Sequence, residues 1–287
     1  SALDHTTPSL DLPIGFVVED SDGDSDFKYV TVAVVDDVPA ATQTITTNED
    51  AALVFNTSAD ANGTNTSIST VATHGVAAVG ADGRITYTPN GNYSGADTFS
   101  YQTVEKGVTT TTTVNVTVKP VADAPTFVDA ATVNPDEDTA VALGLNAPIV
   151  VDTLDQNDVA AGDNPELLSI ITLSGIPTGA KLLDGLNAVI FTSVGDAITI
   201  KLSDGSHISG ASGTLTMSKA QFEALQIMPP ANSHTNFTVT AKVTSYEVDS
   251  SGVQLAGVVG AESTATVAVK VQAVTDPVTL TLVDGND

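Results

Sequence analysis

The chain has 287 residues and no cysteine, and its 35 acidic and 9 basic side chains give a formal net charge of −26. This charge excludes nucleic acids and anionic membranes as partners, because binding to phosphate requires clustered lysine and arginine. The lack of cysteine excludes disulfides and thiolate metal sites. A hydrophobic fraction of 41%, rich in alanine and valine, together with abundant threonine, predicts folded β-structure.

Three stretches along the chain end a valine-rich alternating strand with aspartate and proline. They are VTVAVVDDVP (30–39), VNVTVKPVADAP (114–125) and VAVKVQAVTDP (267–277). Alternation places one face of a strand in a core, and proline then ends the strand while keeping the chain extended. We therefore interpret these stretches as linkers between domains, which divide the chain into segments 1–38, 39–124, 125–276 and 277–287.

The segments between the linkers are predicted to be strands joined by turns. Alternating or β-branched runs predict strands at 81–89, 93–104, 110–118, 167–177, 196–205, 237–246 and 263–274. In SKAQFEALQI (218–227), Ser218 and Gln221 form a capping box, which predicts about two helical turns. Residues 48–53 (NEDAAL) and 136–141 (DEDTAV) follow the first two linkers at similar spacing and indicate an internal repeat at the scale of a domain.

Acidic side chains gather at the turns and linkers, and they form candidate cation sites. Calcium prefers six to eight oxygen ligands from carboxylates, carbonyls and water on a backbone that can curl around the ion. One interpretation is therefore a set of several Ca²⁺ sites, and the alternative is a solvated acidic surface. The candidate ligands are Asp20, Asp22, Asp24, Asp36, Asp37, Glu49, Asp50, Asp97, Asp123, Glu137, Asp138, Asp152, Asp155, Asp158, Asp163, Glu166 and Asp276.

These ligands are expected to act in local clusters or across linkers. Residues 19–26 and 152–166 are the two local clusters. Asp36 and Asp37 are expected to join Glu49, Asp50 and Asp97 at the first linker. Asp123 is expected to join Glu137 and Asp138 at the second linker, so that one ion binds groups from both of the adjoining sandwiches.

No arrangement typical of an enzyme is present in the sequence. The four histidines, His5, His74, His207 and His234, have no paired metal-binding spacing, and no nucleophile elbow or phosphate-binding loop occurs. We therefore expect no enzymatic activity and no catalytic residues.

The quoted motifs resemble the repeated extracellular domains of bacterial RTX adhesins exported by type I secretion. Residues 48–55, 83–101 and 111–125 are similar to a cadherin-like repeat, while 134–143, 167–182, 215–245 and 267–277 are similar to a related Ig-like repeat. Residues 10–39 resemble the closing strands of another repeat. The calcium-binding nonapeptide that names RTX proteins is absent, as expected for a fragment from the middle of such a chain.

The resemblance implies an all-β fold of tandem Ig-like and cadherin-like Greek-key β-sandwiches joined by short Asp/Pro linkers. Residues 1–38 would be the last strands of an incomplete Ig-like repeat. Residues 39–124 would form a cadherin-like sandwich, 125–276 a larger Ig-like sandwich with long loops, and 277–287 the start of the next linker.

The function implied is that of a calcium-stabilised extender on the bacterial surface. It would project ligand-binding modules for attachment to surfaces or cells, as in biofilms, with neighbouring repeats as partners and no insertion into the membrane. The chain would be monomeric within a longer protein. The alternative is that the larger sandwich itself binds a peptide or glycan in a calcium-dependent way, through long segments at 184–212 and 247–263.

Overall fold

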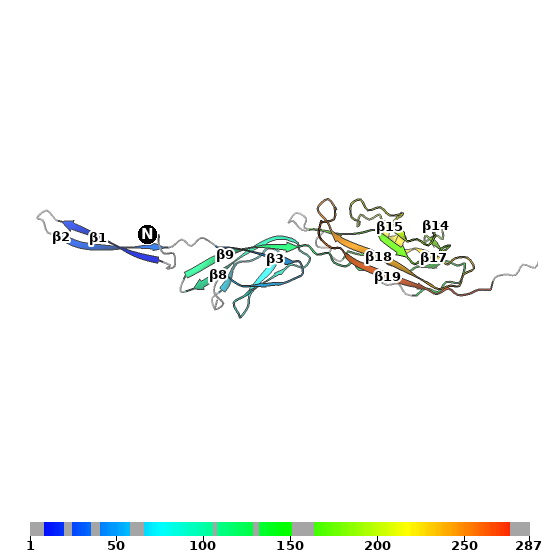
Figure 1. Cartoon of the computed structure of the whole chain (residues 1–287), viewed down its shortest axis with the longest axis horizontal. Helices are drawn as coiled ribbons and strands as arrows, with labels where there is room; N and C mark the ends of the chain where they lie inside the picture. Colours follow the sequence, from blue (N-terminus) through cyan, green and yellow to red (C-terminus); the bar gives the residue numbers. More distant parts are fainter. Residues whose placement is uncertain are drawn as a thin grey trace, which may run out of the picture. The chain divides into compact units, whose positions relative to one another are not determined.

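The computed structural model of the chain describes residues 9–19, 25–35, 41–57, 66–105, 108–128, 132–150 and 164–275. Within these residues the regular secondary structure consists of β-strands and one short helix, and the predicted all-β class is confirmed (Figure 1). The described residues fall into two compact units. The first runs up to Asn90 and includes Ala96–Val118, and the second consists of Gly91–Gly95 and the chain from Lys119 onward.

The first two strands form a ribbon of their own. β1 (Ser9–Glu19) and β2 (Ser25–Val35) pair antiparallel from Ser9 opposite Val35 to Glu19 opposite Ser25. Among the described strands they pair only with each other. The side chains of Ile14, Val17 and Phe27 are exposed. Because a two-stranded sheet is at best marginally stable in water, the prediction of an incomplete repeat at 1–38 remains open.

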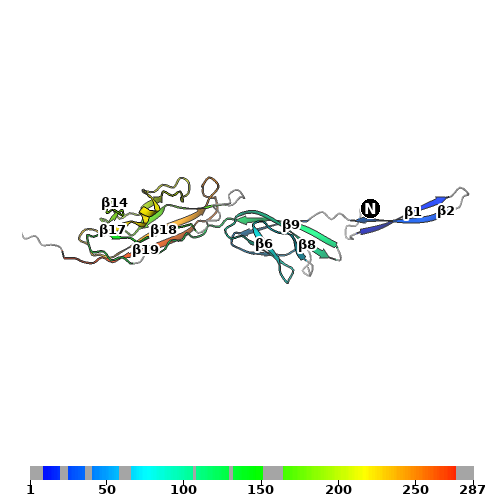
Figure 2. The ribbon, with the colours of Figure 1, turned by 180° about the vertical axis from the view of Figure 1, so that it is seen from behind.

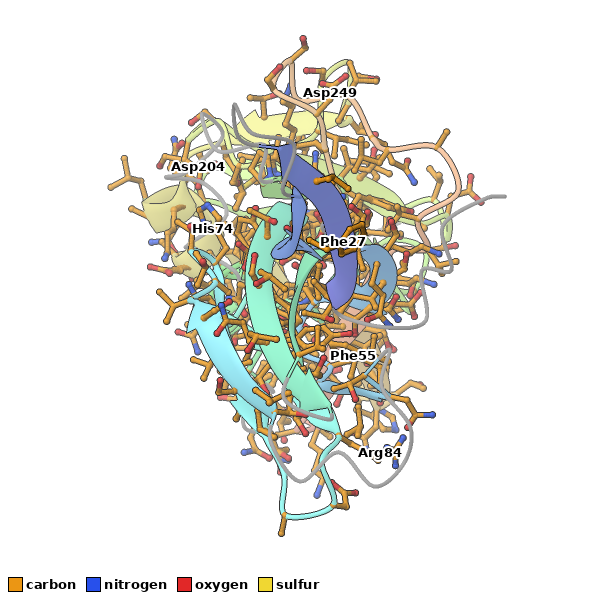
Figure 3. The ribbon with its side chains drawn as sticks, turned by 90° about the vertical axis from the view of Figure 1, so that its left-hand side faces the viewer. Phe27, Phe55, His74, Arg84, Asp204 and Asp249 are labelled. Carbon is orange, nitrogen blue, oxygen red and sulfur yellow. The ribbon has the colours of Figure 1, made fainter. Side chains whose placement is uncertain are left out.

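The first unit contains a β-sandwich of two sheets, with strand orders β3-β9-β8-β5 and β4-β7-β6. Its strands are β3 (Ala41–Asn48), β4 (Leu53–Phe55), β5 (Thr66–Thr70), β6 (Gly75–Val79), β7 (Ile85–Pro89), β8 (Gly95–Glu105) and β9 (Val108–Lys119). The first strand of the sandwich, β3, pairs with the last, β9, while β4, β6 and β7 form the opposite sheet. The chain therefore crosses from one sheet to the other along its length. Tyr87 of one sheet stacks on Phe99 of the other, with ring centroids 5.8 Å apart. Phe55, labelled in Figure 3, lies 6.2 Å from Phe99.

The second unit contains a larger sandwich, with one sheet ordered β10-β17-β13-β14 and another ordered β11-β18-β12-β15-β16, where β19 also pairs with β18. Its strands are β10 (Val141–Ala142), β11 (Glu166–Leu168), β12 (Ile171–Ser174), β13 (Lys181–Leu183), β14 (Val189–Thr192), β15 (Ile198–Leu202), β16 (Leu215–Met217), β17 (Gln226–Met228), β18 (Phe237–Glu247) and β19 (Ala261–Val269). β18 and β19 lie side by side, as the view from behind in Figure 2 also shows. Both sheets contribute to one apolar core.

The predicted helix is present but shorter than expected. α1 spans Lys219–Glu223, and its capping box is formed by Ser218 and Gln221, as predicted. Phe222 is buried in the core. The helix is shorter than the predicted two turns, because Gln226–Met228 forms β17 and pairs with β13 and β10. Pairing with two strands therefore overrides the helical pattern there.

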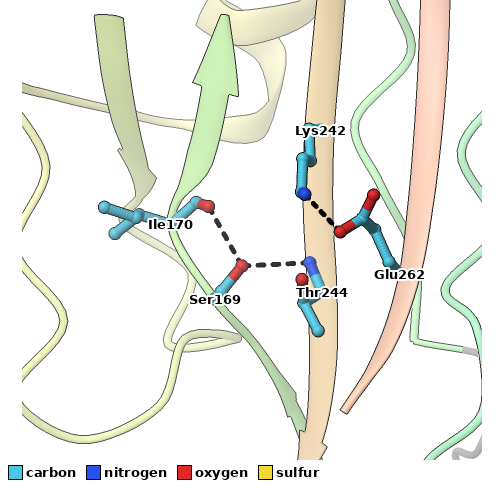
Figure 4. Close-up of polar contacts among 5 residues, drawn as sticks. All are labelled: Ser169, Ile170, Lys242, Thr244 and Glu262. Atoms are coloured by element: carbon cyan, nitrogen blue, oxygen red, sulfur yellow. Dashed lines mark hydrogen bonds and ion pairs between the residues drawn. The ribbon is translucent and has the colours of Figure 1, made fainter. Parts of the chain in front are cut away.

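The predicted strand at 167–177 is interrupted by a bulge. β11 pairs with β18 through Leu168 opposite Ser245, whereas β12 pairs with it through Thr172 opposite Lys242. Three residues on one strand therefore face two on the other, which is the definition of a β-bulge. Ser169 Oγ accepts a hydrogen bond from Thr244 N (3.0 Å) and donates one to Ile170 O (3.1 Å), as Figure 4 shows.

Candidate functional site

Ten of the predicted metal ligands lie outside the described residues and stay predictions. They are Asp20, Asp22, Asp24, Asp36, Asp37, Asp152, Asp155, Asp158, Asp163 and Asp276. In the part of the chain that the structure does describe, no three His, Cys, Asp or Glu side chains converge closely enough to hold a metal ion by themselves. The other seven predicted ligands, Glu49, Asp50, Asp97, Asp123, Glu137, Asp138 and Glu166, lie within the described residues.

The repeated Glu-Asp motif forms the same turn in both units. Asp50 has φ 54° and Asp138 has φ 59°, and each lies in a turn directly before a short strand, β4 or β10. Aspartate tolerates this left-handed conformation better than most residues. The predicted internal repeat therefore corresponds to a repeated backbone turn, which lies just before β4 in the first sandwich and just before β10 in the second.

In the second unit this turn is fastened to the chain that leaves the sandwich. Glu137 N donates to Gln272 O (2.9 Å), and Val274 N donates to Glu137 Oε1 (2.8 Å). Asp138 Oδ1 accepts from Asn232 N (3.0 Å). The turn thus contacts the chain at Gln272 and Val274, and the predicted ligand Asp276 lies outside the described residues.

Asp123 lies elsewhere, at the end of the β11–β18 ladder. Its backbone N donates to Glu166 Oε1, and its carbonyl accepts from Ser245 Oγ. This end of β18 is opposite to the end at Phe237, where β19 finishes and continues toward residues 272–274. At about 3.3 Å per residue the two ends are roughly 30 Å apart. The predicted grouping of Asp123 with Glu137 and Asp138 is therefore wrong. The turn that contains Glu137 contacts Gln272 and Val274, beyond the Phe237 end of β18, whereas Asp123 lies at the Glu247 end.

Asp123 instead accompanies a buried pair of carboxylates. Glu166 and Glu247 stand directly opposite each other on β11 and β18, and they are 0% and 1% exposed. Residues opposite each other on antiparallel strands have Cβ atoms about 5 Å apart. Two buried carboxylates at that separation need a cation or a shared proton to offset their repulsion.

Further oxygen atoms line the same end of the ladder. Asn164 N donates to Ser94 Oγ (3.2 Å), Ser94 Oγ donates to Asn164 Oδ1 (3.3 Å), and Asn164 Nδ2 donates to Val248 O (3.4 Å). This set of carboxylate, amide and hydroxyl oxygens is the chemistry that Ca²⁺ prefers. Glu166 and Glu247 are the two carboxylates that could hold such an ion, together with neutral oxygens such as the Asp123 carbonyl.

Sequence reasoning missed Glu247, although a signal was present. In FTVTAKVTSYE the inward positions are 239, 241, 243, 245 and 247, and all of them are buried. An acidic residue at an inward position of an alternating strand is unusual, because buried carboxylates are costly unless they are paired. The inward position of Glu247 in this alternation was therefore the signal that could have identified it.

Asp97 has a structural environment that needs no metal ion. Its Oδ1 accepts from Thr73 N (3.0 Å) and Thr98 N (2.8 Å), and its Oδ2 accepts from His74 N (3.0 Å) and Tyr87 Oη (2.8 Å). These donors tie β8 to the turn before β6. A shallow hollow of about 440 Å³ lies beside these residues.

One segment of the chain is similar to a known protein family. Residues 36–119 match the family described as "Bacterial Ig domain". This range contains the seven strands of the first sandwich. No curated protein matches the chain. Within the described residues no helix is long and apolar enough to cross a bilayer.

Solved structures resemble the chain only distantly. The endo-fucoidan hydrolase MfFcnA4 of glycoside hydrolase family 107 is 14% identical with a TM-score of 0.25, covering 94% of this chain and 35% of that chain. This chain thus spans about a third of that enzyme's length. Mouse protocadherin-24 EC1-3 is 11% identical with a TM-score of 0.26, covering 95% and 82%. Human protocadherin-24 EC1-2 is 13% identical with a TM-score of 0.29, covering 80% and 84%. Similarity at this level says nothing about the function of this chain.

Proposed function

We propose that this chain is a calcium-stabilised extender segment of a bacterial surface adhesin. Its tandem β-sandwiches space ligand-binding modules away from the cell, and neighbouring repeats are its main partners. The Glu-Asp turn found in both sandwiches supports a repeat architecture, and the family match supports an Ig-like bacterial domain. Export by type I secretion and a role in biofilms are part of this proposal, as is the lack of enzymatic activity.

The observation that carries the calcium part of the proposal is the buried pair Glu166 and Glu247. Replacing the repulsion between two buried carboxylates by attraction to one divalent ion favours the folded state. A ligand present at a hundred times its Kd stabilises by about 2.7 kcal/mol. Bound cations also reduce the repulsion among the acidic side chains of a chain with a net charge of −26, which stabilises the folded state further.

Thermal unfolding followed by far-UV circular dichroism tests this function. The protein is melted in excess chelator, in millimolar calcium and in millimolar magnesium. We expect calcium to raise the Tm strongly and magnesium to raise it much less, because magnesium loses its bound water reluctantly. Equal Tm values in chelator and in calcium would contradict the proposal and leave the acidic groups as a solvated surface.

A matched pair of variants assigns the effect to the buried carboxylates. Glu247→Gln removes one charge of the buried pair and should reduce the calcium-dependent shift in Tm. Glu262→Gln removes a half-exposed carboxylate of the neighbouring strand, which pairs with Lys242 at the surface (Figure 4). That control should keep the full shift. Equal shifts in both variants would place calcium elsewhere in the chain.

A second candidate function is binding of a peptide or glycan by the larger sandwich. Its specific support is the exposure of apolar side chains in the two long segments, where Leu186 is 88% and Val259 is 85% exposed. Soluble glycans and peptides titrated against the protein, with calcium and with chelator, test this function. Binding that is unchanged by Leu186→Ser and Val259→Ser would exclude these segments as the site.

A further inference from the structure

His207 is a buried titratable side chain in the loop that joins β15 to β16. It is 6% exposed, and Leu202 N donates a hydrogen bond to its Nε2 over 2.8 Å. Nε2 can accept only while it carries no proton, so this contact requires the neutral ring with its proton on Nδ1. A protonated imidazole has N–H groups on both nitrogens, which would point a donor at the donor of Leu202. The hydrogen bond is therefore lost on protonation.

The backbone on either side of His207 is fastened to β11. Leu168 N donates to Ser206 O (2.7 Å), and Ile208 N donates to Leu168 O (2.9 Å). Both hydrogen bonds belong to an isolated bridge between Leu168 and His207. The side chain and backbone of His207 thus hold the 203–214 loop against two strands, β15 and β11.

The residue that follows this anchor reaches a second loop. Ser209 N donates to Gly252 O (2.7 Å), and Ser209 Oγ donates to Ser251 O (2.8 Å). Gly252 belongs to the 248–260 loop between β18 and β19, and a Cβ at this position would lie 2.9 Å from Ser209 Oγ. The two loops begin near Asp204 and Asp249, which Figure 3 labels. The 248–260 loop is therefore connected to the anchor at His207 through Ser209.

We propose that His207 is a pH-sensitive latch. The neutral ring holds the 203–214 loop on the sandwich and, through Ser209, holds the 248–260 loop beside it. Protonation breaks the contact with Leu202 and releases both loops while the sandwich stays folded. Mild acidification thus changes the loop-bearing end of the second sandwich, whether or not the chain binds calcium.

The charged groups around the ring favour this behaviour. Burial lowers the pKa of His207 below 6.5, the positive charge of Lys201 on β15 lowers it further, and the Ser169 backbone and the Asp204 carboxylate partly oppose this. Asp204 is held by its own loop, because its Oδ1 accepts from Ser206 N (3.0 Å) and Ser206 Oγ. The uncharged residues Leu168, at the end of β11, and Ser169, in the bulge that follows, lie next to His207.

The remaining carboxylates on the neighbouring elements have other hydrogen-bond donors. Glu166, at the start of β11, accepts from Asp123 N. Asp249, in the second loop, accepts from Ser251 N (2.8 Å) and Val253 N (3.0 Å). Asp204 is therefore the carboxylate that acts on the ring, and it is too weak to reverse the effect of burial.

Because the pKa of His207 is lowered in the latched state, the latch is weakened by acid. The released ring titrates near 6.5 and the latched ring titrates lower, so the released state binds more protons between these two values. The latch is fully stable above pH 6.5 and weakens as the pH falls below it. While the latched ring stays neutral, the equilibrium for release grows about tenfold for each pH unit below 6.5.

Hydrogen exchange measured by NMR on the whole chain tests the latch. Protection factors of the Leu202, Ile208 and Ser209 amides are measured from about pH 8 to about pH 5, with the amides of β19 as the internal reference. We expect protection in the loop to fall about tenfold per pH unit below 6.5, while protection in β19 stays constant. A parallel loss in β19 would mean unfolding of the whole sandwich and would overturn the proposal.

Two glutamine variants serve as the test and the control. His207→Gln keeps an oxygen acceptor for Leu202 N but cannot be protonated in this range, so protection in its loop should not depend on pH. His234→Gln changes an exposed histidine of the same unit and should behave as the wild type. The same pH dependence in His207→Gln and in the wild type would refute the latch.

A ring titration keeps the proposal testable if His207→Gln does not fold. In the wild type, the His207 ring resonance and the Leu202 and Ser209 amide shifts should change together, with one midpoint below 6.5. A midpoint at 6.5, or amide shifts that do not follow the ring, would refute the proposal.

Discussion

Asp97 is an acidic side chain whose four hydrogen-bond donors all come from its own sandwich. Three of them are backbone N–H groups at a strand start and a turn, and the fourth is the buried hydroxyl of Tyr87. A carboxylate offers two oxygens with about four acceptor positions, so this set of donors satisfies it. Acidic residues in this chain therefore serve at least two purposes, and Asp97 serves the structural one.

Asp97→Asn should destabilise the first sandwich by about 2–4 kcal/mol, because one pair of donors would then face an amide N–H₂ group and lose its acceptor. Chemical denaturation of the variant measures the loss. Asp82→Asn is the control, since the exposed Asp82 Oδ1 accepts from Arg84 N (3.1 Å), and an amide oxygen can replace it. A loss below about 0.5 kcal/mol in Asp97→Asn would show that its charge is not needed.

At the scale of an element, the bulge between β11 and β12 decides which side chains enter the core. Leu168 is inward before the bulge, and Ile171 and Leu173 are inward after it. The extra residue changes the parity of the strand, so an unbroken alternation through 167–177 would place one half of these residues outside. The same bulge sets the register that brings Glu166 opposite Glu247.

The residue after β12, Gly175, can only be glycine without strain. Its φ is +77°, and a Cβ there would lie 2.1 Å from Thr238 O. Gly175→Ala should therefore cost about 3 kcal/mol or more, because backbone strain and a steric conflict add together. Gly210→Ala is the matched control, with φ +79° and nothing within 4 Å of the added Cβ.

Strain alone predicts a loss of about 1–2 kcal/mol for Gly210→Ala. Chemical denaturation of the two variants, compared with the wild type, separates strain from steric conflict. Equal losses would show that the backbone near Thr238 moves away at little cost.

At the scale of the whole molecule, the net charge of −26 opposes compaction. Like charges are screened over about 10 Å at 0.1 M salt. In chelator, raising sodium chloride from about 0.02 M to about 0.5 M should therefore stabilise the fold by about 1 kcal/mol, or roughly 2–4 °C in Tm. Calcium should act at much lower concentration than sodium, because it binds at sites rather than screening.

The control for this prediction is sodium chloride added in the presence of millimolar calcium, where the increase in Tm should be smaller. A Tm in chelator that does not rise with sodium chloride would show that the acidic side chains are too far apart to repel one another effectively.

The sequence alone determined the fold class, the capping box at Ser218 and the repeated Glu-Asp turn. These features depend on local patterns, namely alternation, a four-residue hydrogen-bonding signature and the backbone preference of aspartate. The strands β8, β9 and β18 follow the predicted runs closely for the same reason.

Only the tertiary structure decided which acidic residues meet. Glu166 and Glu247 are 81 positions apart in the printed sequence, and a one-residue bulge sets their pairing, while Asp123 and Glu137 lie at opposite ends of one sandwich although they are close in sequence. Strand pairing also limits the predicted two-turn helix to Lys219–Glu223, because Gln226–Met228 forms β17. Long-range pairing and register decide these features, because a strand shows which faces alternate but not which strand lies beside it.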